Sequence, residues 1–190
     1  METKRNLISA IRTAVVPFLL ILLSVPLFSA SPDKLAKIKD LSGLWKFSIG
    51  DREEWMTINY DDSDWESIKV PSPWEEQGFY GYNGFASYRK SFTLSGDLKG
   101  KTLYLVLGYI DDVDETYLNG KKIGSTGSMP PSYTTAYNAK RVYYIPENYL
   151  NFGGKNIISI KVYDSYQAGG IVSGEVGIYS SYNDMKLTIN

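Results

Sequence analysis

Apolar and polar positions alternate with the period of β-strands from residue 41 onward. Short apolar or alternating runs are separated by Gly, Asn, Pro and Asp, which favour turns, and Asn119-Gly120 predicts a tight hairpin. Helical patterns are short, at residues 33–41 and 146–150. Strands are predicted at residues 44–49, 55–60, 65–70, 85–94, 102–109, 115–120, 140–146, 156–164 and 176–180, with 186–190 as a further candidate. This pattern predicts an all-β protein, a two-sheet jelly-roll β-sandwich.

Residues 85–94 show the alternation most clearly. Ala86, Tyr88 and Phe92 are predicted to face the core, whereas Ser87 and Arg89 are placed on the polar face. Arg89 is therefore a candidate for an ion pair or a ligand contact near the protein surface.

The N-terminus has the order of a secretory signal peptide. Basic residues (Lys4, Arg5 and Arg12) precede an apolar run at 14–28, and small residues follow at 29–31. We expect residues 1–30 to be the signal peptide, residues 31–40 a linker or short helix, and residues 41–190 the jelly-roll domain. The alternative is an uncleaved N-terminal anchor, although the apolar run is shorter than the roughly 20 residues of a membrane-spanning helix. Both interpretations place the domain outside the cytoplasm, in the periplasm or the extracellular space.

The residue types that are missing exclude several kinds of chemistry. The chain has no His and no Cys, so His-dependent triads, His-ligated metals and thiol chemistry are unavailable to it. With 20 Lys+Arg against 21 Asp+Glu the net charge is −1, and no nucleic-acid partner is expected. Any site must therefore use carboxylates, amides, Tyr, Lys or a cation bound by oxygen atoms.

Four of the five residues from Asp111 to Glu115 are acidic and follow an apolar run. Strand alternation places Asp112 and Asp114 on one face and Asp111 and Glu115 on the other, so we do not expect the four carboxylates to converge. An exposed strand end with structural hydrogen bonds is the prediction. A structural calcium site is the alternative, and it would need further oxygen ligands from loop carbonyls.

Six segments, in chain order, carry a resemblance to a known domain: LSGLWKFSIGD, NYDDSDWESIKVPSPWEEQG, YNGFASYRKSF, LGYIDDVDETYLNGKKIG, RVYYIPENYL and NIISIKVYDSYQAGGI. Together they resemble the N-terminal sugar-binding-type jelly-roll domain of glycoside hydrolase family 2 enzymes, the β-galactosidases and β-glucuronidases. A similar domain is inserted in sialate O-acetylesterases. The resemblance covers residues 41–180.

This resemblance implies where a sugar would be contacted. In the β-galactosidases, an Asn five residues before a Tyr and an Asp that ends a late strand reach toward the sugar pocket. The matching residues here are Asn83, with Tyr88, and Asp164. The family's catalytic Glu pair lies in a (β/α)₈ barrel of about 250 residues, and the esterases use a Ser–His pair. We therefore expect a non-catalytic domain.

Two long loops, residues 70–84 and 125–138, are rich in aromatic residues, Pro and Gly. Loops on a rigid sandwich commonly carry binding residues, and an exposed Trp74 would stack on a sugar ring. The alternatives are that Trp74 folds over the open end of the sandwich and that Asp164 caps its turn. The predicted ligand-binding residues are Trp74, Asn83, Tyr88, Arg89, Tyr137, Asp164 and Tyr166.

The sequence thus predicts an exported, non-catalytic module that binds carbohydrate. The alternatives are a ligand-sensing or protein-docking module with a partner protein in the cell envelope, and an accessory subunit of a glycoside hydrolase. Neither a metal nor an organic cofactor is required, and membrane contact would come only through an uncleaved N-terminal segment.

Overall fold

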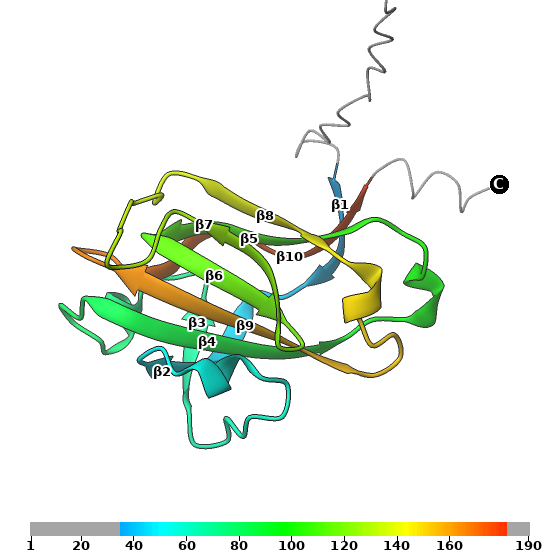
Figure 1. Cartoon of the computed structure of the whole chain (residues 1–190), viewed down its shortest axis with the longest axis horizontal. Coiled ribbons are helices and arrows are strands. Elements are labelled where there is room, and N and C mark those ends of the chain that lie inside the picture. Colours follow the sequence, from blue (N-terminus) through cyan, green and yellow to red (C-terminus); the bar gives the residue numbers. More distant parts are fainter. Residues whose placement is uncertain (1–34, 182–190) are drawn as a thin grey trace, which may run out of the picture.

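The structure, a computed structural model, describes residues 35–181, which form two antiparallel β-sheets (Figure 1). The strands are β1 (Leu35–Asp40), β2 (Gly43–Ile49), β3 (Glu66–Val70), β4 (Gly84–Thr93), β5 (Leu103–Asp111), β6 (Val113–Leu118), β7 (Lys121–Thr126), β8 (Lys140–Ile145), β9 (Lys155–Asp164) and β10 (Gly170–Ser181). One sheet has the order β1-β10-β5-β8, and the other has the order β3-β2-β4-β9-β6-β7. The predicted β-sandwich is confirmed.

Some predictions concern other parts of the chain. The expected signal peptide at 1–30 and the candidate strand at 186–190 lie outside the described residues. Within residues 35–181, no helix is both long and apolar enough to cross a membrane.

The hydrophobic core lies between the two sheets and follows from the alternation within strands. Leu105 and Leu107 of β5 face Ile158 and Ile160 of β9, and all four side chains belong to one buried cluster. Burial of one such side chain stabilises the fold by about 1.5–3 kcal/mol. These two strands, β5 and β9, lie in the interior of their sheets and not at an edge.

Two predicted elements are wrong. Residues 35–40, expected to be helical, form β1 and pair with β10. Residues 55–60, expected to be a strand, begin with the end of the 3₁₀ turn η2 (Glu53–Met56) and continue as irregular chain. In β1, pairing with β10 outweighs the local helix propensity. In η2, the adjacent residues Trp55 and Met56 are both buried, whereas a strand would direct neighbouring side chains to opposite faces. The helix predicted at 146–150 is reduced to the 3₁₀ turn η5 (Glu147–Tyr149).

The connection between β2 and β3, residues 50–65, lies over the outer face of the six-stranded sheet. It carries a second hydrophobic cluster, formed by Trp55, Met56 and Trp65. Its Gly50 carbonyl accepts a hydrogen bond from the Ser87 hydroxyl at 2.9 Å. This covering segment buries the face of β4 that the sequence predicted to be polar and accessible.

Arg89 lies beneath the covering segment, 1% exposed. Its Nε donates to Asp62 Oδ2 at 2.7 Å, and its Nη1 donates to the Thr57 carbonyl at 2.9 Å and to Ser159 Oγ at 3.0 Å. Of the two roles predicted for Arg89, the ion pair is confirmed, with Asp62 as its partner, and the ligand contact near the protein surface is wrong. Its guanidinium instead holds the covering segment onto the sheet.

Candidate functional site

Three carboxylates converge where the chain crosses from one sheet to the other. Asp111 ends β5, and β6 begins at Val113 in the opposite sheet. One carboxylate oxygen from each of Asp111, Asp112 and Asp164 lies within 4.8 Å of the other two. We call these three residues the acidic corner. The prediction that the carboxylates do not converge is wrong for Asp111 and Asp112, because alternation holds only within a strand and the crossing interrupts it.

Asp112 is fixed by hydrogen bonds from two loops. Its Oδ1 accepts from the Thr135 hydroxyl at 2.6 Å, and its Oδ2 accepts from the backbone N–H and the hydroxyl of Ser165 at 3.0 and 2.9 Å. Burial acts to raise the pKa of Asp112, but these bonds outweigh it and lower the pKa to about 2. Asp112 therefore stays ionised and ties the 128–138 loop to the end of β9.

Asp164 is fully buried, and one of its oxygens has no hydrogen-bond partner. Its Oδ1 accepts from the Tyr166 backbone N–H at 3.2 Å, whereas Oδ2 is unpaired. Burial raises the pKa of Asp164 to about 6, with added repulsion from Asp112 and Glu75. A buried acceptor without a partner is costly, so this atom favours a proton, a cation or a donor from a ligand.

Asp111 is the partly exposed member of the acidic corner. Burial, a hydrogen bond shared with Asp112 and nearby negative charge raise the pKa of Asp111 to about 7. At neutral pH the corner thus combines one firmly ionised carboxylate with two that readily take up a proton.

Replacing Asp111 with Asn is expected to reduce the pH dependence of stability between about pH 4 and 7. The unfolded side chain ionises near pH 3.8 and the folded one near 7, so the unfolded state is favoured as pH rises through this window. Asn does not ionise, so the variant does not lose stability as the pH rises through this window. At pH 8 its free energy of unfolding should exceed that of the wild type by on the order of 1 kcal/mol, after allowance for the partial exposure of residue 111.

Urea denaturation at several pH values between 4 and 8 would measure this. Asp61→Asn, at a fully exposed carboxylate, is the control and should not flatten the pH profile. An unchanged pH profile in Asp111→Asn would refute the raised pKa.

The rim of the acidic corner carries exposed polar and aromatic side chains. Asn83 is exposed and directly precedes Gly84, which pairs with Asp164 across β4 and β9. Tyr166 is 72% exposed and follows Asp164 by two residues. Tyr137 is 56% exposed and lies one residue after Ala136, whose N–H donates to the Asp112 carbonyl at 3.3 Å. Four predicted site residues, Asn83, Tyr137, Asp164 and Tyr166, thus lie around one corner.

Trp74 and Tyr88 lie inside the protein, so the prediction that they contact a ligand is wrong, whereas the prediction from alternation that Tyr88 faces the core is confirmed. Both are fully buried in the core, and Trp74 Nε1 donates to the Tyr82 carbonyl at 3.2 Å. The backbone at Gly169 and Gly170 packs against the two rings so closely that a Cβ would lie 2.1 Å from the Trp74 ring and 2.3 Å from the Tyr88 hydroxyl. Trp74 closes the open end of the sandwich, which was the alternative drawn from the sequence.

The remaining two acids of the run are structural. Asp114 is fully buried and pairs with the equally buried Arg141, Nε to Oδ1, at 3.0 Å. The Tyr143 hydroxyl donates to the same carboxylate at 2.8 Å. Glu115 pairs with the partly exposed Lys122 at 2.6 Å. The predicted exposed strand end is therefore wrong for Asp112 and Asp114, which are buried.

Asp111, Asp112 and Ser165 are site residues that the sequence prediction did not include. An acidic pair that directly follows a predicted buried strand, with a second strand starting at once, is a signal that the chain changes sheets there. Asp164 could then have been joined to the pair, because it also ends a strand.

The donor set of the acidic corner is compatible with an oxygen-loving cation. Three carboxylates and the Ser165 hydroxyl are hard ligands of the type that Ca²⁺ prefers. Calcium takes six to eight oxygens, so ligand hydroxyls or water would have to supply the rest. The unpaired Oδ2 of Asp164 is the atom most in need of such a partner.

Comparison with known proteins identifies β-glucuronidases among the proteins to which this chain is similar. A β-glucuronidase from Formosa agariphila is 27% identical over 133 residues, which are 62% of this chain and 12% of that protein. The structure of a β-glucuronidase from glycoside hydrolase family 2 matches 75% of this chain and 17% of its own with a TM-score of 0.63 and 21% identity. A calcium-binding mutant of Bacteroides uniformis β-glucuronidase 2 matches 77% of this chain and 18% of its own, with a TM-score of 0.61 and 25% identity.

No family model matches the sequence. The chain spans about an eighth of the length of the curated relatives that it matches. The resemblance to one domain of family 2 glycoside hydrolases, drawn from the sequence, is confirmed by these relatives and by the shared fold.

Proposed function

We propose that this domain, similar to one part of the family 2 β-glucuronidases, binds carbohydrate at the acidic corner without itself catalysing hydrolysis. One observation carries the proposal: the buried carboxylate of Asp164 has an unpaired oxygen beside two further carboxylates. Sugar hydroxyls are donors that carboxylates accept, and the exposed rings of Tyr137 and Tyr166 offer faces for C–H contacts.

A ligand reaches Asp164 by displacing the turn that follows it. Tyr166 is mostly exposed, and its backbone N–H is bound to Asp164 Oδ1. Because Asp164 is fully buried, the turn must move away from it before a ligand can bind. Asn83, on the opposite side, would supply an amide that both donates and accepts.

The acidic corner favours neutral sugars over uronates. A uronate carboxylate would meet like charge from Asp112 and from the ionised fraction of Asp111, which disfavours binding. A calcium ion held by the three carboxylates would reverse that preference, because it would bridge protein and sugar. The calcium dependence of binding therefore reports on the sugar class as well as on the cation.

The experiment is a glycan array probed with the purified protein, once with calcium and once with chelator. We expect binding to at least one glycan, with affinity reduced about tenfold or more by Asp164→Asn and by Tyr137→Ala. Tyr144→Ala is the matched control, since Tyr144 is exposed to the same degree (54%) and lies toward the other end of β8.

Thermal unfolding of each variant separates loss of binding from loss of folding. Binding that survives both corner substitutions would disprove the site. A blank array with folded protein would favour the protein-docking or ligand-sensing role in the cell envelope. Either role would be exercised outside the cytoplasm if the N-terminal segment directs export.

A further inference from the structure

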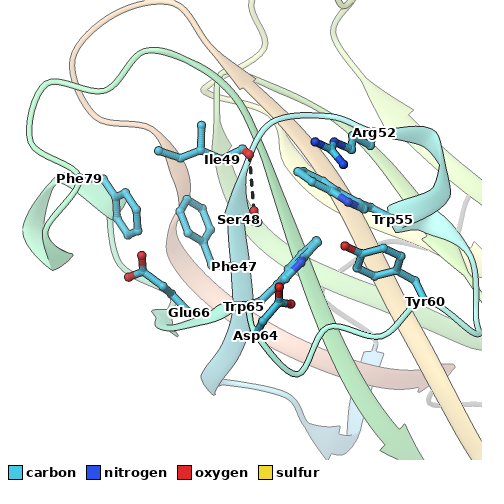
Figure 2. Close-up of a pocket in the computed structure, with 10 residues that line it drawn as sticks. All are labelled: Phe47, Ser48, Ile49, Arg52, Trp55, Tyr60, Asp64, Trp65, Glu66 and Phe79. Carbon is cyan, nitrogen blue, oxygen red and sulfur yellow. Dashed lines mark hydrogen bonds between the residues drawn. The ribbon is translucent and has the colours of Figure 1, made fainter.

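A pocket of about 440 Å³ lies at the edge of the six-stranded sheet and shares no residue with the acidic corner (Figure 2). Ligand pockets commonly have volumes of about 300–1,000 Å³, so this one suits a small ligand. Figure 2 shows Phe47 and Phe79 on one side of the pocket and the rings of Trp55, Tyr60 and Trp65 on the other.

The pocket exists because β3 is shorter than its partner. The last pair between the two strands is Phe47↔Glu66, and continuation of that register would place Asp64 opposite Ile49. Instead, the chain turns away before Glu66, with the Trp65 N–H bound to the Asp62 carbonyl at 3.1 Å. The end of β2 is therefore left without a strand neighbour on this side within the described residues.

The unpaired end of β2 presents backbone groups to the pocket. The Gly50 N–H donates to the Phe85 carbonyl of the other neighbour at 2.7 Å. Because successive residues of a strand direct their N–H and C=O groups to opposite sides, the backbone groups of Ile49 face the missing β3 position. Ile49 thus offers its N–H as a donor at the pocket, and its carbonyl already accepts a long hydrogen bond of 3.5 Å from the Ser48 hydroxyl (Figure 2).

Charged side chains complete the polar lining. Asp64 and Glu66 are exposed acids, and Figure 2 shows them well apart from the guanidinium of Arg52. Arg52 lies over the Trp55 ring at 5.6 Å, and its contact with Glu54 is long, 3.9 Å, and exposed. The pocket therefore combines aromatic walls with carboxylate acceptors and a guanidinium donor.

We propose that this pocket is a second carbohydrate site that takes one pyranose ring. The half-buried rings of Tyr60 and Phe79 would receive the C–H face of the sugar, since Phe47, Trp55 and Trp65 are only 1, 6 and 8% exposed. Asp64 and Glu66 would accept hydrogen bonds from its hydroxyls, and Arg52 would donate to a ring or hydroxyl oxygen. A pyranose matches this lining because it has an apolar face and hydroxyls around its edge. This inference is independent of the proposed function, since it involves none of the acidic-corner residues.

The test is titration of the isotopically labelled protein with methyl β-D-glucopyranoside, methyl β-D-galactopyranoside and methyl β-D-xylopyranoside, followed by amide and indole NMR signals. We expect at least one glycoside to shift the Ile49 amide and the Trp55 and Trp65 indoles. Glu66→Gln and Asp64→Asn should each weaken that binding by about tenfold. Glu175→Gln, at an exposed acid of β10 in the other sheet, is the control and should leave it unchanged.

Both acids are exposed, so these substitutions are not expected to prevent folding. Shifts confined to Tyr166 and its neighbours would support the acidic corner alone and overturn the second site. The second site is equally overturned if no glycoside shifts the Ile49 amide, or if Glu66→Gln and Asp64→Asn bind as the wild type does. Asp164→Asn is expected to leave these shifts unchanged, which would show that binding at the pocket does not depend on the acidic corner.

Discussion

Arg141→Met is expected to lower the free energy of unfolding by about 3–5 kcal/mol, because it leaves the carboxyl group of Asp114 in the core without its charged partner. Both side chains are fully buried. Arg141 also donates to the carbonyls of Asp112 and Ala136 at 2.8 and 2.7 Å, so the substitution removes several hydrogen bonds that join β8 to the acidic corner. Urea denaturation at pH 7 measures the loss.

Lys122→Met is the matched control for this effect. It breaks the partly exposed pair with Glu115, and such pairs contribute about 0–1 kcal/mol. The penalty of Arg141→Met should also shrink at low pH, where Asp114 can take up a proton. If Arg141→Met lowers the free energy of unfolding by no more than Lys122→Met does, the buried pair of Arg141 and Asp114 does not stabilise the core.

Trp74→Ala is expected to lower the free energy of unfolding by about 3–5 kcal/mol, because it leaves a large cavity and unpairs the Tyr82 carbonyl. The Trp74 ring packs against Phe47 and Tyr82, with centroid distances of 5.9 and 5.8 Å. In a domain of this size the melting temperature should fall by on the order of 10 °C. Thermal and urea denaturation both report the change.

Tyr166→Ala is the control, since that aromatic side chain is mostly exposed and its loss should change stability by less than about 0.5 kcal/mol. The two variants thus separate a core residue from a rim residue. A Trp74→Ala protein as stable as the wild type would mean that packing of the indole at the end of the sandwich does not stabilise the fold. Loss of sugar binding in that variant would carry no information about direct contact unless its folding were intact.

The acidic run from Asp111 to Glu115 shows how one sequence feature divides into different roles. Asp114 and Glu115 lie in β6 and make ion pairs of the buried and the surface kind, respectively. Asp111 and Asp112 instead join Asp164, which is about fifty residues away in the sequence. Because β5 and β9 end and β6 begins at this corner, the carboxylates meet through the pairing of strands and not through their spacing.

The sequence by itself determined the β-sandwich, the positions of most of its strands and the domain family that it resembles. These features depend on local alternation and turn chemistry, which a short window of residues contains; the hairpin at Asn119-Gly120 is an example. Asn83 and Asp164 lie at one corner of the domain, and only the resemblance, which supplies a long-range relation that the local pattern lacks, linked them at the level of the sequence.

Only the tertiary structure decided which faces are covered and which distant groups meet. Arg89 lies on a face that alternation marks as polar, yet residues 50–65 fold over it and bury it. Trp74 begins the 3₁₀ turn η3 (Trp74–Gln77) within a segment that the sequence predicted as a loop, and its ring is buried against the backbone of Gly169. The pocket beside Ile49 exists because the neighbouring strand β3 begins only at Glu66 and leaves the end of β2 without a partner on that side. Each outcome is set by contacts between segments far apart in the chain, which local periodicity does not encode.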